Sequence, residues 1–126
     1  MEVVLDASAL LALLHDEPGA DVVESVLPDA IISSINLAEV IGKLNAIGMP
    51  EESVRAAIGA FALPVVSFDE ELAYVAGLLY RSTQPRGLSL GDRACLALAL
   101  HRGVKVFTAD TTWSSLKLAI DVQVIR

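Results

Sequence analysis

The sequence predicts an α/β fold, a three-layer α/β/α sandwich built around a parallel sheet. Short runs rich in β-branched residues alternate with longer helix-forming runs, and this alternation is typical of a parallel sheet. The strand-like runs are apolar at successive positions, as expected for strands covered on both faces. Proline and glycine mark turns between these runs, and no linker divides the chain of 126 residues. We therefore expect one domain spanning residues 1–126.

The expected strands are short and apolar, and they lie at Glu2–Asp6, Ala30–Ser33, Pro64–Phe68, Val104–Thr108 and Val122–Ile125. Leucines fill the helical run after the first strand, Pro18 suits the first turn of the next helix, and acidic residues open the run after Asp69, as the helix dipole favours. The expected helices lie at Ala7–His15, Pro18–Val26, Leu37–Ile47, Pro50–Phe61, Asp69–Arg81, Ser89–Arg102 and Thr111–Leu118.

Composition excludes several classes of protein. The chain has 9 Lys and Arg against 16 Asp and Glu, a net charge of −7, which argues against a nucleic-acid coat protein or a membrane-surface binder. Cys95 is the only cysteine, so an internal disulfide and a thiolate metal cluster are both excluded. The start has no basic region typical of a signal peptide, and the longest apolar run, Ala94–Leu100, is too short for a membrane span. We expect a cytoplasmic protein that does not bind membranes.

The usual nucleotide and hydrolase motifs of α/β proteins are missing. No glycine-rich phosphate loop follows the first strand, and no Gly-x-Ser-x-Gly turn is present. His15 and His101 lie near predicted helix ends, where surface positions are usual. Chemistry based on histidine or zinc is therefore not expected.

Four acidic residues stand where the apolar pattern does not explain them. Asp6 ends the first strand, Asp110 follows the fourth, Asp92 lies in the first turn of an apolar helix, and Glu39 lies within another. Each has a structural alternative as a helix cap: Asp6 and Asp110 at helix starts, Asp92 in a capping box with Ser89, and Glu39 in a looser box.

Parallel topology brings these acids toward one edge of the sheet. Carboxylates that converge repel one another, and a divalent cation relieves that repulsion. Ligation by oxygen alone favours Mg²⁺ or Mn²⁺ over Zn²⁺. The hydroxyls of Ser8 and Thr108 can hold a carboxylate or a metal-bound water, or can instead bond local backbone amides.

The motifs that contain these acids resemble those of PIN domains, and most closely those of VapC toxins from type II toxin–antitoxin pairs. The four runs are Val3–Leu10, Leu37–Val40, Leu88–Ala94 and Thr108–Trp113, and their order and spacing span the whole chain.

The resemblance implies a Mg²⁺-dependent endoribonuclease, with Mn²⁺ as a substitute, that hydrolyses RNA with a metal-activated water. It implies that Asp6, Glu39, Asp92 and Asp110 are the catalytic residues and metal ligands. It further implies a sheet in the order 3-2-1-4-5, a homodimer, and inhibition by a small antitoxin protein.

Two further residues near these motifs have alternative roles. Asn36 stands where threonine or serine is common in the family, and an amide there can still cap the helix. Arg93 can contact phosphate or pair with a carboxylate. Arg81, Arg86 and Arg93 are the arginines nearest in sequence to the Asp92 motif and are candidates to meet the charge of the substrate.

Alternative functions are a catalytically silent PIN-like interaction module and an aspartate-based phosphotransfer or phosphatase domain. Phosphatases of that kind need a second aspartate two residues after the first, where this chain has Ser8. The leucines of the Ala7–His15 helix suggest a dimer, because they cover more surface than one sheet face buries, unless neighbouring helices cover them instead.

Overall fold

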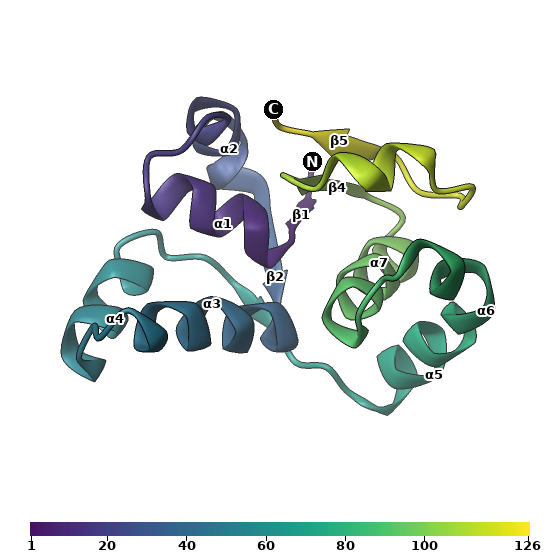
Figure 1. Ribbon diagram of the computed structural model, residues 1–126, viewed down its shortest axis with the longest axis horizontal. Helices are drawn as coiled ribbons and strands as arrows, with labels where there is room; N and C mark the ends of the chain where they lie inside the picture. Colours follow the sequence, from purple (N-terminus) through teal and green to yellow (C-terminus); the bar gives the residue numbers. More distant parts are fainter.

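Five parallel strands form one sheet in the order β3-β2-β1-β4-β5 (Figure 1). The computed structural model describes residues 1–126. Its strands are β1 (Val3–Leu5), β2 (Ala30–Ser33), β3 (Val65–Val66), β4 (Lys105–Thr108) and β5 (Val122–Val124). Val4 of β1 lies between Ile31 of β2 and Val106 of β4, so β1 is the central strand. The predicted fold class and strand order are confirmed.

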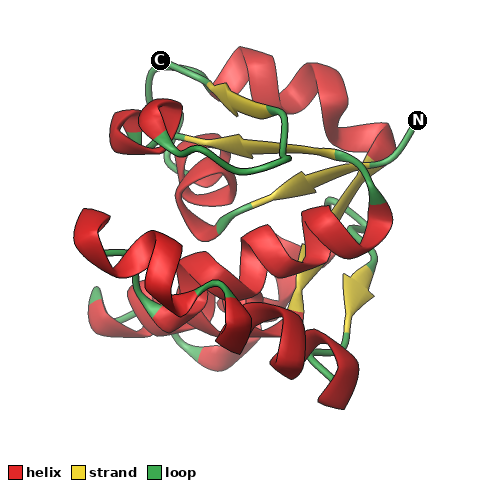
Figure 2. Ribbon diagram, turned by 90° about the vertical axis from the view of Figure 1, so that its right-hand side faces the viewer, coloured by secondary structure: helices red, strands yellow, loops and turns green.

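Helices lie on both faces of this twisted sheet (Figure 2). The α-helices are α1 (Ala7–Leu14), α2 (Ala20–Val26), α3 (Ser34–Ala46), α4 (Glu51–Gly59), α5 (Glu70–Leu78), α6 (Tyr80–Thr83) and α7 (Leu90–Arg102). Three short 3₁₀ helices complete the fold: η1 (Leu27–Asp29), η2 (Gln84–Arg86) and η3 (Thr111–Ser115).

Successive residues of the central strand face different cores. Val4 packs with residues of α5 and α7 on one side of the sheet, including Leu72 and Leu96. Val3 and Leu5 pack on the other side with residues of α1 and α2. Because both faces of β1 are buried, its continuous apolar run is the pattern expected of a parallel strand.

Several predicted elements differ in extent from the observed ones. The third strand is only Val65–Val66, an edge strand that pairs with β2 alone, and Pro64 before it has no N–H to donate. The predicted Asp69–Arg81 helix ends at Leu78, and a separate short helix, α6, follows. The predicted Thr111–Leu118 helix is a 3₁₀ helix that ends at Ser115, because Leu116 has extended backbone angles.

The leucines of α1 are buried or partly buried within one chain. Leu10 is fully buried, and Leu11, Leu13 and Leu14 pack against a core that includes Val40 and Leu44 of α3. The neighbouring helices therefore account for much of the apolar surface of α1, as in the alternative to a dimer. The dimer itself stays a prediction.

Crossing a membrane requires a helix both long and apolar, and none of the helices here meets that requirement.

Candidate active site

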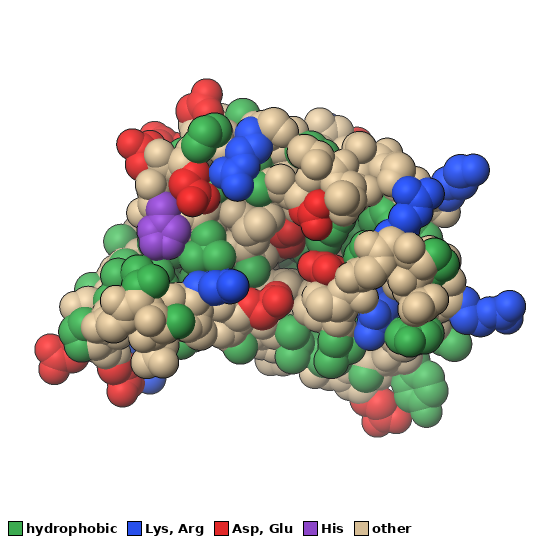
Figure 3. All heavy atoms as spheres, viewed as in Figure 1, with side chains coloured by type: hydrophobic (Ala, Val, Ile, Leu, Met, Phe, Trp, Pro, Cys, Tyr) green, Lys and Arg blue, Asp and Glu red, His purple; other side chains and the backbone are tan.

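The four predicted carboxylates line one cavity at the carboxyl edge of the sheet. This cavity has a volume of about 190 Å³, and Asp6, Glu39, Asp92 and Asp110 are among its nine lining residues. Asp6 follows β1, Asp110 follows β4, and Glu39 and Asp92 come from α3 and the first turn of α7. Acidic side chains gather in the middle of this face of the molecule (Figure 3). The structure thus brings the four side chains together, and their role as metal ligands remains a prediction.

Asp6 is the buried member of the group, with 5% of its surface exposed. Its Oδ1 accepts hydrogen bonds from the Ser8 hydroxyl at 2.7 Å and from the Ala9 amide at 2.8 Å. Its Oδ2 accepts one from the Thr108 hydroxyl at 2.5 Å. Burial is the main cause that raises the pKa of Asp6 from 3.8 to about 6; the three hydrogen bonds lower it, and the charge of Asp92 raises it slightly.

Ser8 and Thr108 fill both of the roles that the sequence left open. Each hydroxyl donates to Asp6, and each also accepts from a backbone amide: Ala109 N–H donates to Ser8 Oγ at 2.9 Å, and Asp110 N–H donates to Thr108 Oγ1 at 3.0 Å. The two hydroxyl oxygens are 3.3 Å apart. This network ties the start of α1 to the end of β4 and fixes the orientation of the Asp6 carboxylate.

Asn36 has a different role from the predicted one. The helix begins at Ser34 and is capped by Ser33, so Asn36 lies inside α3 and does not cap it. Its amide instead donates to Glu39 Oε1 at 2.7 Å and to the Gly91 carbonyl of α7 at 3.0 Å. Asn36 therefore orients the Glu39 carboxylate and joins α3 to α7. The looser capping box predicted for Glu39 was wrong.

Asp110 caps η3 and Asp92 belongs to the capping box of α7, and each keeps one oxygen with no hydrogen bond. Asp92 Oδ2 accepts from the Ser89 amide at 2.9 Å, which completes the predicted capping box, and its Oδ1 has no protein donor. Asp110 Oδ1 accepts from the amide and hydroxyl of Thr112, and its Oδ2 has no donor. Glu39 Oε2 is free in the same way. The predicted alternative of a capping role is thus confirmed for Asp6, Asp92 and Asp110. In Asp92 and Asp110 this role leaves one carboxylate oxygen free to bind a ligand.

The donor set of this cavity fits a hard divalent cation. No three acidic, histidine or cysteine side chains stand close enough to form a complete ligand set as they are. However, the free donors are all oxygens, the ligand type that Mg²⁺ and Mn²⁺ prefer. Asn36 also lines the cavity, and its buried Oδ1 has no hydrogen-bond partner. An unpaired buried oxygen among carboxylates is consistent with a bound cation or its water.

Lys43 also lines this cavity, and the sequence analysis missed it. It lies on α3, four residues after Glu39, so the two side chains share one face of the helix. That spacing was the available signal. Lys43 places a positive charge beside the four carboxylates.

Arg93 does not pair with a carboxylate. Its Nη1 donates to the Leu88 carbonyl at 3.0 Å, and its guanidinium lies 5.0 Å from the centre of the Tyr80 ring. No ion pair includes Arg93, and it does not line the cavity. Of the two alternatives for Arg93, the pair with a carboxylate was wrong, and contact with phosphate stays a prediction.

The histidines and the cysteine lie outside the cavity. His15 is the exposed C-cap of α1, and His101 is exposed in the last turn of α7, as expected. Cys95 is fully buried in α7, and burial raises the pKa of its thiol well above the ordinary value, with smaller contributions from the charges of nearby acids.

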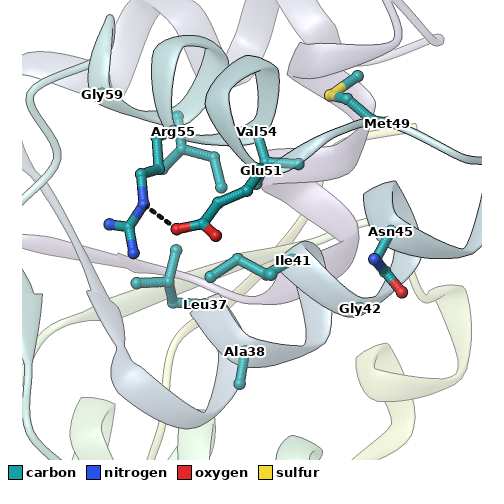
Figure 4. A pocket seen from close by; sticks show the side chains of 11 residues that line it. Leu37, Ala38, Ile41, Gly42, Asn45, Met49, Glu51, Val54, Arg55 and Gly59 are labelled. Carbon is teal, nitrogen blue, oxygen red and sulfur yellow. Dashed lines mark hydrogen bonds and ion pairs between the residues drawn. The ribbon is translucent and has the colours of Figure 1, made fainter.

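The largest cavity lies between α3 and α4 (Figure 4). It has a volume of about 710 Å³ and mainly apolar walls, including Leu37, Ile41 and Met49. Glu51 and Arg55 form an ion pair of 2.8 Å at its side. None of the four predicted ligands lines it.

A parallel sheet in this order, with acids from two strand ends and two helices in one cavity, defines a PIN-like α/β domain. The family model that describes the PIN domain matches residues 3–118, and the chain belongs to this family. A comparison with curated proteins finds no relative that matches.

Solved structures share the fold. A DNA-bound VapBC complex from Salmonella typhimurium contains a chain similar over 100% of this chain and 99% of its own, with 19% identity and a TM-score of 0.78. VapBC2 from Rickettsia felis, bound to promoter DNA, contains a chain similar over 98% of this chain and 98% of its own, with 17% identity and a TM-score of 0.75. VapC20 from Mycobacterium tuberculosis is described as a toxin that cleaves the sarcin-ricin loop. It is similar over 95% of this chain and 99% of its own, with 16% identity and a TM-score of 0.74.

Proposed function

We propose that this protein is a divalent-metal-dependent endoribonuclease and the toxin of a toxin–antitoxin pair. The observation that carries the proposal is the single cavity lined by Asp6, Glu39, Asp92 and Asp110. The fold it shares with VapC toxins supports the same function, since one of these is described as cleaving an RNA loop. The four carboxylates would hold Mg²⁺ or Mn²⁺, directly or through water.

When bound there, the cation neutralises the carboxylates, lowers the pKa of water and polarises a phosphoryl oxygen. The chain's own residues prepare the cavity for it. Ser8 and Thr108 hold Asp6 in one orientation, and Asn36 does the same for Glu39. Asp110 is fixed by Thr112, and Asp92 by the backbone of Ser89. No cysteine or histidine lines the cavity, and the hydroxyl of its one serine, Ser8, is held between Asp6 and the Ala109 amide. We therefore expect water to attack and to leave a 5′-phosphate and a 3′-hydroxyl.

The proposed partners are an RNA substrate, a second copy of the chain and an antitoxin. Several VapBC neighbours are complexes, which supports a cognate antitoxin. Exposed apolar side chains on α5, Tyr74 at 64% and Leu78 at 82%, support a dimer. Sedimentation at tens of micromolar tests the dimer directly, and a monomer at that concentration would remove it.

The nuclease function is tested by incubating the protein with RNA and Mn²⁺, with and without a chelator. We expect cleavage only with the metal, and at least a 100-fold loss in Asp6→Asn and Asp92→Asn. Glu51→Gln, which removes an exposed acid outside the cavity, is the matched control and should cleave normally. A folded protein that leaves RNA intact with Mn²⁺ would instead indicate a silent interaction module, and full activity in Asp6→Asn would refute the assigned site.

A further inference from the structure

Charge is divided unevenly along this chain. Residues 1–71 contain thirteen of the sixteen acids and only two of the nine lysines and arginines, whereas residues 72–126 contain seven cations and three acids. Two of those seven, Arg102 and Arg126, form ion pairs with Glu2 and Glu17 of the acidic half. The other five, Arg81, Arg86, Arg93, Lys105 and Lys117, have no acidic partner.

Three of the unpaired cations lie on segments close in sequence to the elements that carry Asp92 and Asp110. Arg81 is exposed on α6, Arg86 ends η2 shortly before the start of α7, and Lys117 is exposed just after η3. The helix α7 carries Asp92 in its first turn, and Asp110 caps η3, so Arg86 and Lys117 flank the segments that present these acids. We call Arg81, Arg86 and Lys117 the cationic strip.

Two of its segments are joined by a side-chain contact. Arg86 Nη1 donates a hydrogen bond to Ser115 Oγ, which connects η2 to η3. Figure 3 shows Lys and Arg side chains along the right-hand side of the molecule, over α6 and the segment after η3, on the same face as the acids in the middle. The other two unpaired cations do not belong to this surface: Arg93 lies against Tyr80, and Lys105 begins β4 at the opposite edge of the sheet.

A nuclease of net charge −7 must hold a polyanion next to its own carboxylates. Lys43 in the cavity supplies one positive charge, and bound cations offset only the acids that hold them. The remaining phosphates of a substrate therefore need cations outside the cavity, and unpaired side chains provide these without breaking an ion pair.

We propose that the cationic strip binds the phosphate backbone of the RNA strand that leaves the carboxylate cavity across η3 and η2 toward α6. This inference rests on the proposed nuclease function and names where that substrate is held. The strip positions RNA and takes no part in the cleavage itself. A phosphate chain is its ligand, whereas an acidic protein segment or an anionic membrane would be a different occupant.

The test compares two double variants with the same net charge. Arg81→Gln with Lys117→Gln removes two charges from the strip, and Arg55→Gln with Lys105→Gln removes two elsewhere. Binding of a fluorescent single-stranded RNA 20-mer is measured by anisotropy in chelator at several salt concentrations, so that no strand is cut. We expect the strip variant to bind about fivefold to tenfold more weakly and its salt slope to fall by about 1.4, and the other variant to match the wild type.

Cleavage with Mn²⁺ gives a second readout. The strip variant should have a raised KM and an unchanged kcat, since its cleavage site is intact. Equal weakening in both double variants would overturn the proposal, because only net charge would then matter. The proposal would also be overturned if the strip variant kept its RNA binding but lost binding to vesicles with 30% phosphatidylserine or to an acidic peptide. Absence of cleavage in the wild type would count against the nuclease function, whereas normal wild-type cleavage with no strip effect would count against the strip alone.

Discussion

The carboxylate of Glu39 lies directly against the α carbon of Gly91, on the first turn of α7. A methyl group placed on Gly91 would stand 2.5 Å from Glu39 Oε1 and 2.6 Å from both Cδ and Oε2. Such distances are shorter than any stable contact, so the absence of a side chain at position 91 creates the space that the carboxylate fills. The Asn36 amide bonds both partners and holds this arrangement.

Gly91→Ala should therefore reduce activity without unfolding the protein. The displaced atoms belong to the far end of a flexible side chain, so Glu39 can rotate away at small cost. Alanine also has a better helix propensity than glycine, by about 1 kcal/mol. We expect RNA cleavage to fall at least tenfold while the midpoint of urea unfolding stays the same or rises.

Gly77→Ala on α5 is the matched control, because it makes the same change in a helix where nothing lies within 4 Å of the new methyl group. It should keep full activity. A Gly91→Ala variant with wild-type cleavage would show that the position of Glu39 against α7 does not matter for the reaction.

Burial of Asp6 predicts a specific dependence of stability on pH. Since the pKa of Asp6 is raised from 3.8 to about 6, the folded state binds this proton more tightly than the unfolded state does. The contribution of Asp6 to stability is therefore greatest below pH 4, falls between pH 4 and pH 6, and stays constant above. The charged form costs the folded protein about 3 kcal/mol at neutral pH.

Asp6→Asn removes this cost along with the proposed ligand. In chelator at pH 7.5, we expect its free energy of unfolding to exceed that of the wild type by up to about 3 kcal/mol, and the difference to vanish toward pH 4. Urea unfolding of both proteins from pH 4 to pH 7.5 measures this. A difference that does not change with pH would mean that Asp6 titrates normally.

Binding of a divalent cation should reverse the destabilisation from these acids. At a concentration 100 times its Kd, a ligand of the folded state adds about 2.7 kcal/mol, which corresponds to a rise in Tm of roughly 10 °C for a domain of this size. We expect Mn²⁺ to produce such a rise in the wild type and in Glu51→Gln, and a much smaller one in Asp92→Asn and Asp110→Asn. Equal rises in all four proteins would place the metal elsewhere.

The sequence was sufficient to predict the sheet and the convergence of the acids, and it was less informative about helix ends. The parallel sheet follows from the alternation of strands and helices, whereas its strand order was implied by the resemblance to PIN domains. Asp6 and Asp110 were correctly expected at the same edge of the sheet, where both line one cavity. The start of α3 was misplaced because Ser33 is the cap and lies within the strand-like Ala30–Ser33 run. A short polar residue at a strand end can serve either element, and only tertiary packing decides.

Long-range side-chain partners were not predictable for a related reason. The Asn36 contact with Gly91 joins residues 55 apart, and Arg93 of α7 lies over the ring of Tyr80, the first residue of α6. Nothing local in the sequence specifies these pairs, although the four-residue spacing of Glu39 and Lys43 did place both on one helix face.

The hydrogen bond from Thr108 to Asp6 joins two residues 102 apart in sequence and is the strongest of the contacts that lower the pKa of Asp6. Thr108→Val keeps the shape of the side chain, removes this donor, and also leaves the Asp110 amide without its acceptor. We expect the pKa of Asp6 to rise further, which moves the acidic limb of the activity–pH profile upward by about one pH unit, and stability to fall by about 1–3 kcal/mol. Thr108→Ser retains the hydroxyl and should restore both the profile and the stability. If valine and serine at this position give the same profile, the hydroxyl does not control the ionisation of Asp6.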